Sequence, residues 1–367
     1  MQMPHRLRVL RPSRGARAVH IALVWLLLVG TLATVAGAGA LTLLGARFDA
    51  QRTVLTDAFP DSALRAPVTV GPIYAAQNIL LIGAAPADPA AADPADADPP
   101  DADPVGADPA ASDPVVTPER FTGMMLVHAP ANRAALQVMS ILSDTEVTLP
   151  GQGPESFTDL LAGGGVARVV QGVEGLLGVR MNHVAVVDLA AVSEITDLVG
   201  GIGLFNTVGM MSTGADRHYF ALDTLNLDGP RALEYVAGDF AVVDSDYRRA
   251  RSQQTYTSAV LSHVRKNLLH NPLLLPRLLD LVADNLAADS GLTASYITAL
   301  AAQLLRVRGG DTVFFFLPTG MVPAVGDAPP VRVPHPDKMD SVRSAFQTDA
   351  FDPDYWNPTP VQSRIND

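Results

Sequence analysis

The feature that most constrains the fold is a stretch without any charged side chain, which runs from Ile21 to Ala46. A helix needs about 20 apolar residues to cross a bilayer, so this stretch is long enough to span one. Residues 1–18 contain no acid and five arginines, at positions 6, 8, 11, 14 and 17. Because basic flanks stay on the cytoplasmic side, the sequence predicts a cytoplasmic tail over 1–18 and a single transmembrane anchor over 19–46. The rest would be extracytoplasmic at the cell membrane. A cleaved signal peptide is the alternative, since small residues at 36–40 resemble a cleavage site.

A tract of alanine, aspartate and proline over residues 84–118 interrupts the remaining chain. It holds eight of the aspartates and no Lys or Arg, and it accounts for much of the net charge of −12. Proline blocks regular structure and little of the tract can be buried, so we expect a disordered insertion. A calcium-binding repeat is the alternative, but the regular ligand spacing is missing. The acidic balance excludes nucleic acid as a partner, and the absence of cysteine excludes disulfides and thiol catalysis.

Apolar runs and helical patterns alternate between residues 76 and 320 and predict an α/β domain with helices on both faces of a sheet. We expect residues 47–75 to be a juxtamembrane connector and residues 321–367, rich in Pro, Asp and Asn, to be a loose tail. The strands are expected at 78–83, 123–128, 135–142, 183–189, 202–206 and 313–317, and the helices at 166–177, 191–199, 231–236 and from 255 onward.

The candidate chemistry lies between Leu225 and Gln254. An Asp-Gly-Pro turn at 228–230 is followed by three aspartates, at 239, 244 and 246, and three arginines, at 248, 249 and 251. Guanidinium groups bind phosphate oxygens in pairs, so this segment could hold a phosphate. A solvated helix start with salt-bridged charges is the alternative. No phosphate loop, serine-hydrolase elbow or His-Glu-x-x-His motif is present, and His128 and His183 lie within apolar strands.

Four segments together resemble the LytR-CpsA-Psr family: MMLV at 124–127, SILSDT at 140–145, the stretch 173–205, and LDGPRALEY at 227–235. The resemblance covers residues 76–83 and 119–320. It implies a three-layer α/β/α sandwich outside the cytoplasm behind a membrane anchor. It also implies a polyprenyl pyrophosphate-linked glycopolymer as substrate and Mg²⁺-dependent transfer of that polymer to the cell wall.

The sequence departs from the family's working residues. Two family aspartates are replaced by Ala85 and Thr122, and three arginines by Ser143, Ala237 and Asp239, while Ser252 stands where a further arginine is found. The resemblance therefore implies a degenerate active site. The remaining candidates for phosphate binding are Arg249, Arg251, Arg120 and Gln253, and those for a metal are Asp144 and Asp246.

Three functions follow from this pattern. The first is a member that binds a polyprenyl-phosphate-linked glycan with weakened or lost catalysis, or that assists active paralogues. The second is a working Mg²⁺-dependent transferase that attaches a glycopolymer to peptidoglycan. The third is a structural envelope protein that binds a protein partner.

Overall fold

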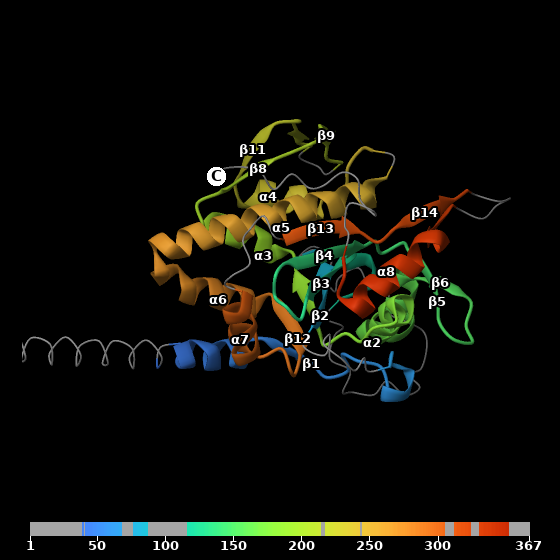
Figure 1. Ribbon diagram of the computed structural model, residues 1–367. Helices are drawn as coiled ribbons and strands as arrows, with labels where there is room; N and C mark the ends of the chain where they lie inside the picture. Colours follow the sequence, from blue (N-terminus) through green and yellow to red (C-terminus); the bar gives the residue numbers. More distant parts are fainter. Residues whose placement is uncertain are drawn as a thin grey trace, which may run out of the picture. The chain divides into compact units, whose positions relative to one another are not determined.

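The computed structural model describes residues 39, 41–67, 76–86, 116–213, 217–242, 244–304, 312–323 and 330–351 (Figure 1). The predicted cytoplasmic tail, most of the predicted anchor and most of the Ala/Asp/Pro tract lie outside these residues. The chain divides into two compact units, Met1–Arg47 and Phe48–Asp367. In the first, the described residues 41–47 are helical.

The second unit combines a central sheet with helices. Its helices are α2 (Phe157–Leu177), α3 (Ala190–Leu198), α4 (Gly229–Ala237), α5 (Ser245–His270), α6 (Leu275–Asp284), α7 (Ala294–Leu304) and α8 (Pro336–Thr348), with 3₁₀ turns η1 (Ser62–Leu64), η4 (Pro118–Arg120) and η5 (Pro272–Leu274). Its strands are β1 (Thr53–Leu55), β2 (Gln77–Ala84), β3 (Phe121–Ala129), β4 (Leu136–Ile141), β5 (Glu146–Thr148), β6 (Pro154–Ser156), β7 (His183–Asp188), β8 (Ile202–Phe205), β9 (Met210–Met211), β10 (Tyr219–Phe220), β11 (Thr224–Leu227), β12 (Leu286–Asp289), β13 (Thr312–Phe316), β14 (Thr319–Val322) and β15 (Val331–Pro334).

Seven strands form the central sheet in the order β1-β12-β7-β2-β3-β4-β13. Strands β2 and β3 are antiparallel neighbours, with Ile82 opposite Met124, so the chain leaves β2 for the Ala/Asp/Pro tract and returns beside it. Strand β7 is parallel to β2, and β13 is parallel to β4. The carboxyl ends of β2, β4, β7 and β13 therefore meet at one edge of the sheet.

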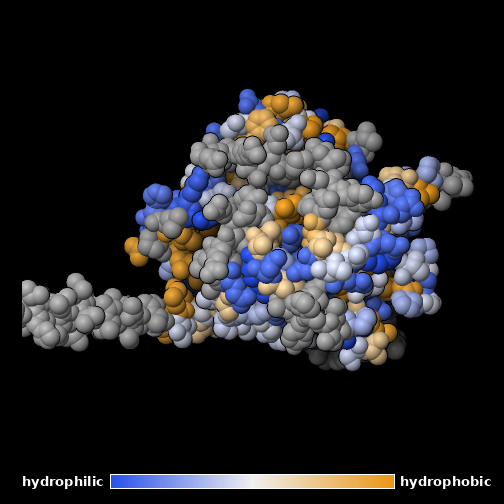
Figure 2. All heavy atoms as spheres, in the orientation of Figure 1, coloured by the Kyte–Doolittle hydropathy of each residue, from blue (hydrophilic) through white to orange (hydrophobic). Residues whose placement is uncertain are grey.

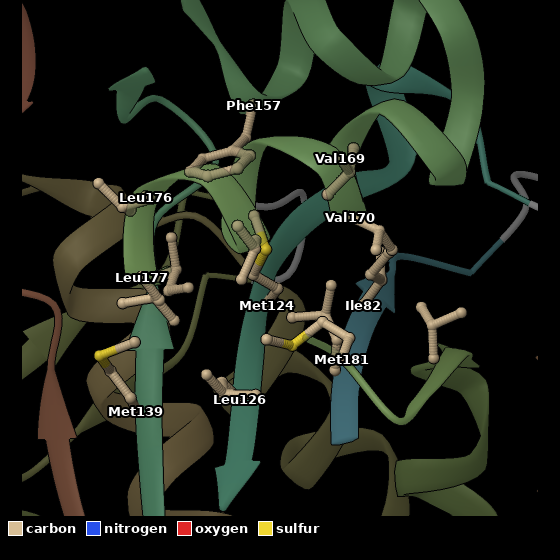
Figure 3. Packing of buried hydrophobic residues seen from close by; sticks show 14 of the residues in the cluster. Ile82, Met124, Leu126, Met139, Phe157, Val169, Val170, Leu176, Leu177 and Met181 are labelled. Carbon is tan, nitrogen blue, oxygen red and sulfur yellow. The ribbon is translucent and has the colours of Figure 1, made fainter. Parts of the chain in front are cut away.

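Alternation of side chains along the strands gives the sheet two covered faces. Leu80 and Ile82 point to one face and join the main core cluster, to which α2 and α8 contribute (Figure 3). In Figure 3, Phe157, Val169 and Val170 of α2 face Met124 and Leu126 of β3. The intervening residues Leu81 and Met125 point to the opposite face, toward α3 and α5. The predicted α/β fold with a central sheet is confirmed.

The prediction of a loose tail over 321–367 is wrong for residues 330–351. Strand β15 pairs with β14, and Met339, Val342 and Phe346 of α8 are buried in the main core. These residues recur at helical spacing, which is a pattern of an amphipathic helix. The abundance of Pro and Asp concealed that periodicity, although Pro336 stands at the start of the helix, where proline is well tolerated.

The segment after the predicted anchor is also more than a connector. Residues 53–55 form β1, the edge strand of the sheet, parallel to β12. Farther on, the Arg65 side chain and the Ala66 backbone N–H donate to the buried carboxylate of Glu174 on α2. The part of residues 47–75 that the structure describes is thus packed on the domain.

One helix among the described residues, α2, is long and apolar enough to cross a membrane. Phe157, Leu160, Val169, Val170 and Leu177 of this helix are each fully buried in the main core. We assign α2 to the core of the domain.

Both strand histidines are buried, as expected, and each contacts an aspartate. His183 Nδ1 lies 3.1 Å from the carboxylate of Asp289, and His128 Nε2 lies 2.7 Å from Asp349 Oδ1. Burial alone would raise the pKa of Asp289. Hydrogen bonds from His183, Val184 and Gly291 outweigh it and hold that pKa below the usual value.

This shift makes stability depend on pH. Since the folded-state pKa of Asp289 lies below the unfolded value of about 3.9, its contribution is complete above that value and is lost as the pH falls through the folded pKa. We expect Asp289→Asn to lower the midpoint of urea unfolding at pH 6. Below about pH 4, the midpoint should fall less steeply with decreasing pH in this variant than in the unmodified protein. The exposed Asp340→Asn should change neither quantity. An unchanged slope in Asp289→Asn would contradict this assignment.

Candidate functional site

An apolar cavity of about 200 Å³ lies between the sheet and the helices α3 and α5. Its floor comes from β2, β3 and β7, and its roof from the two helices and the end of α4. The side chains that close it include Leu81, Met125, Val187, Ile195 and Tyr256. A cavity lined in this way suits a hydrocarbon ligand.

Gly83 near the end of β2 and Gly123 near the start of β3 allow the two strands to lie close together next to this cavity. A Cβ atom at Gly83 would stand 2.6 Å from Oγ1 of Thr122, and Gly123 has a φ of +123° that side chains rarely adopt. Thr122 Oγ1 donates to the Gly83 carbonyl at 3.2 Å. The position where the family has an aspartate therefore carries a neutral hydroxyl that donates to Gly83 and accepts from Gln253 Nε2 at 3.4 Å.

Helix α5 carries both polar and cavity-lining residues on one side. Arg249, Gln253 and Thr257 follow one another at intervals of four, so they lie on the same face. Gln253 and Thr257 line the cavity, and Gln253 Nε2 donates to the Val236 carbonyl at 3.1 Å and contacts Thr122 Oγ1 at 3.4 Å. Arg249 lies one turn nearer the helix N-terminus. This face of α5 thus passes from a guanidinium to an apolar cavity within about two turns.

Two carboxylates hold Arg249. Its Nη1 lies 2.5 Å from Asp239 Oδ1, and its Nη2 donates to Asp246. The Asp239 side chain is 66% exposed, whereas that of Arg249 is 12% exposed. Asp239 therefore neutralises Arg249, and a phosphate would have to compete with an exposed carboxylate.

Arg120, the third predicted phosphate ligand, is bound at the carboxyl ends of β2 and β7. Its Nε donates to the Ala85 carbonyl and its Nη2 to Asp188 Oδ2, each at 2.7 Å. Asp188 Oδ1 in turn accepts from the Ala190 N–H at the start of α3. Arg120 therefore ties the start of β3 to two neighbouring strands.

An arginine that the sequence did not reveal lies in the same region. Arg332 of β15 donates through Nε to both oxygens of Asp144, at 2.9 and 3.0 Å, and through Nη2 to Asp244 Oδ2 at 2.8 Å. Burial raises the pKa of Asp144, the charges of Asp246 and Asp244 raise it further, and Arg332 opposes them. Arg332 follows Asp144 by 188 residues, so no local pattern could have linked them.

Arg251 is buried and lies on a different side of α5 from Arg249. Burial lowers the pKa of Arg251, and the nearby charge of Arg248 lowers it further. Successive residues on a helix are rotated by about 100°, so Arg251 does not take the place of the family arginine at Ser252. Ser252 itself is buried against the Tyr235 hydroxyl, whose pKa burial raises to about 12.

The predicted metal ligands do not assemble into a metal site. Within the described ranges, no group of three or more Asp, Glu or His side chains is placed to share an ion. Asp144 is paired with Arg332 and Asp246 with Arg249. Ser143, where the family has an arginine, is buried, and its carbonyl accepts from Thr158. Carboxylates that are already paired with arginines do not fit Mg²⁺.

Comparison with known proteins agrees with the fold. TagU of Enterococcus faecalis, a polyisoprenyl-teichoic acid–peptidoglycan teichoic acid transferase, is 29% identical over 154 residues, which are 41% of this chain and 49% of that protein. LcpA of Corynebacterium glutamicum, a cell wall biosynthesis protein, is 30% identical over 162 residues, which are 43% of this chain and 30% of that protein. The chain spans half the length of these relatives or less.

Solved structures show the same architecture. The LytR-Csp2A-Psr enzyme from Actinomyces oris superposes with a TM-score of 0.57 at 20% identity, covering 82% of this chain and 97% of that one. TagV of Bacillus subtilis gives a TM-score of 0.57 at 16% identity, covering 75% and 97%. Residues 75–311, more than half of the chain, match the model of the LytR_cpsA_psr family, and the chain belongs to that family.

Proposed function

We propose that this protein is a membrane-anchored, extracytoplasmic protein of cell-wall biogenesis that binds a polyprenyl-phosphate-linked glycopolymer and has weakened or lost transfer activity. The names of its relatives support the substrate class, since TagU is a transferase of polyisoprenyl-linked teichoic acid to peptidoglycan. The uncharged stretch 21–46 and the arginines before it support the anchor.

The observation that carries the proposal is the shared face of α5. Arg249 lies at the N-terminal end of a long helix, where the helix dipole favours a negative group. Gln253 and Thr257 lead from there into the apolar cavity. A polyprenyl phosphate has this same order of charge followed by hydrocarbon. We place the phosphate near Arg249 and the first prenyl units in the cavity, within the three-layer sandwich that the family implies.

Weakened transfer follows from what the site has lost. Removing one donor that stabilises charge in a transition state costs about 10²–10³ in rate. Ala85 and Thr122 supply no carboxylate at the edge of β2 and β3, and both carboxylates predicted as metal ligands are engaged by arginines. Ground-state binding needs fewer of these groups, because the cavity contributes independently of charge.

A working transferase remains the second candidate, favoured by the transferase name of the Enterococcus relative. It would have to rebuild its site from two arginines and three aspartates: Arg249, Arg251, Asp144, Asp244 and Asp246. Mg²⁺-dependent transfer of glycopolymer by the unmodified chain, at a rate unaffected by Ala85→Asp with Thr122→Asp, would establish this candidate and contradict weakened catalysis.

The binding assignment predicts opposite effects at two paired residues. We expect Arg249→Ala to weaken binding of polyprenyl phosphate by the full chain about tenfold, the lower end for a hydrogen bond to a charged group, because Asp239 and Asp246 already share the guanidinium. We expect Asp239→Asn to tighten binding several-fold, since it releases Arg249 and removes a repelling charge. The measurement is a titration with the lipid phosphate in detergent micelles.

Arg168→Ala is the matched control, since Arg168 of α2 is also paired with a surface carboxylate, that of Glu155. It should leave the affinity unchanged. Equal effects of Arg249→Ala and Arg168→Ala, or weaker binding in Asp239→Asn, would show that the phosphate does not bind at Arg249.

A further inference from the structure

The turn between α5 and α6 forms an apolar and basic surface at the end of the domain, which we call the α5–α6 tip. The Leu273 side chain in η5 is 82% exposed and Leu261 of α5 is 52% exposed. Three exposed cationic residues flank them: Arg265, Lys266 and Arg277. Figure 2 shows hydrophobic and hydrophilic side chains side by side at this end of the domain.

Helix α6 continues the apolar surface. Its sequence is LPRLLDLVAD, yet Ala283 is its only buried residue. Leu274 of η5 and Leu275, Leu278, Leu279, Leu281 and Val282 of α6 are all only half-buried. A helix this apolar is normally covered in a soluble domain, so another apolar phase is needed to complete its burial.

The charge of the α5–α6 tip indicates which apolar phase covers it. Residues 257–279 contain no acid, although the whole chain carries a net charge of −12, and the two acids of α6, Asp280 and Asp284, lie in its second half. Exposed leucines surrounded by lysine and arginine suit the interface of a bilayer with anionic headgroups, where each Lys or Arg contributes roughly fivefold to partitioning. A second copy of this acidic chain, or an acidic protein, would be drawn by the same charges but would not require the exposed Leu273 to insert.

The first residues of the domain contact the two elements that follow α6 in the chain. Asp49 Oδ1 accepts from the Ala294 N–H at the start of α7, and Arg52 donates to the carbonyls of Ala288 and Asp289 in β12. Strand β12 follows directly after α6. The first residues of the domain are therefore held by β12 and the start of α7.

We propose that the α5–α6 tip inserts Leu273 and the half-buried face of α6 into the headgroup region of an anionic membrane. This goes beyond ligand binding and needs no glycopolymer. This proposal can be combined with the proposed function. Tyr256, which lines the cavity, lies about four turns before the C-terminal end of α5. Docking that end of α5 on the bilayer would turn the cavity toward the membrane, where prenyl lipids reside.

The absence of cysteine makes the test direct, since one introduced cysteine gives one labelled position. Full-length Leu273→Cys carrying an environment-sensitive fluorophore would be placed in nanodiscs of zwitterionic lipid, with and without anionic lipid. We expect a blue shift and quenching by nitroxide-labelled headgroups in the anionic discs. Leu222→Cys, 61% exposed on the segment between β10 and β11, is the matched control and should show neither.

Neutralising the cations should reverse the effect. We expect Arg265→Gln, Lys266→Gln and Arg277→Gln each to reduce the equilibrium constant for docking by about fivefold in the Leu273→Cys background. Equal quenching at positions 273 and 222, or equal quenching in discs with and without anionic lipid, would overturn the proposal. A blue shift that depends on protein concentration and not on lipid would overturn it in favour of a second copy. Polyprenyl phosphate is absent throughout, so failure here leaves the binding assignment at Arg249 untouched.

Discussion

Phe346→Ala is expected to lower the free energy of unfolding by about 3–5 kcal/mol, the usual cost of removing a buried aromatic ring. Phe346 is 1% exposed on α8 and belongs to the main core cluster under the sheet. Its ring lies edge-on to that of His128, with the ring centroids 5.4 Å apart. Truncation would leave a cavity between α8 and β3 that the surrounding rigid sheet cannot close. Urea unfolding of the full chain measures the effect.

Gln347→Ala is the matched control, because Gln347 is the next residue of the same helix and is exposed. It should change the free energy of unfolding by less than about 0.5 kcal/mol. If the C-terminal tail were loose, neither substitution would change the free energy of unfolding. An effect of Phe346→Ala below about 1 kcal/mol would therefore show that α8 is not part of the core.

The central strands could be predicted from the sequence because burial on both faces makes them continuous apolar runs. NILLIG at 78–83 is such a run in β2, which has strands on both sides. VFFFL at 313–317 was also predicted, although β13 lies at an edge of the sheet. Helix starts were harder. Helix α5 begins at Ser245, ten residues before the predicted start, because Asp244 caps it by accepting from the Tyr247 N–H. The alternative interpretation of this segment, a helix start with salt-bridged charges, is the one that the structure shows.

The helix predicted over 166–177 is present as the part of α2 that follows its glycines, but the part before them was missed. Gly163, Gly164 and Gly165 suggested a loop before the helix, whereas α2 begins at Phe157 after a capping box of Ser156 and Asp159. Gly165 has a φ of +65°, so the glycines form a kink within the helix instead of a boundary. Glycine permits the positive φ, but sequence alone does not say whether a helix resumes on both sides.

In the candidate site, contacts between residues near in sequence could be predicted, whereas contacts between distant residues could not. Asp239, Asp246 and Arg249 are close in sequence, and a turn between α4 and α5 brings them together as salt-bridged charges. Asp144 and Asp244 are joined only by Arg332, from a hairpin beyond the residues that match the family. Pairs that depend on tertiary packing over such a separation leave no periodic signal in a single sequence.

Glu174→Ala is expected to cost about 3–5 kcal/mol, since it breaks a buried ion pair and leaves its partners unsatisfied. Glu174 is 1% exposed in the last turn of the core helix α2. Its carboxylate accepts from Arg65 Nη2 at 2.5 Å, from the Ala66 N–H at 3.1 Å and from the Met181 N–H at 2.9 Å. The substitution would strand the Arg65 guanidinium and release the segment that joins the predicted anchor to the domain.

Glu155→Ala is the control. Glu155 of β6 also pairs with an arginine, Arg168 of α2, but this pair lies at the surface. A surface pair contributes about 0–1 kcal/mol, so the two Glu→Ala variants should differ by at least about 2 kcal/mol in urea unfolding. Hydrogen exchange at residues 62–66 should also accelerate in Glu174→Ala and not in Glu155→Ala, because only Glu174 holds that segment. Similar losses of stability in both variants would mean that residues 53–67 are a free connector, which would reinstate the original prediction for this segment.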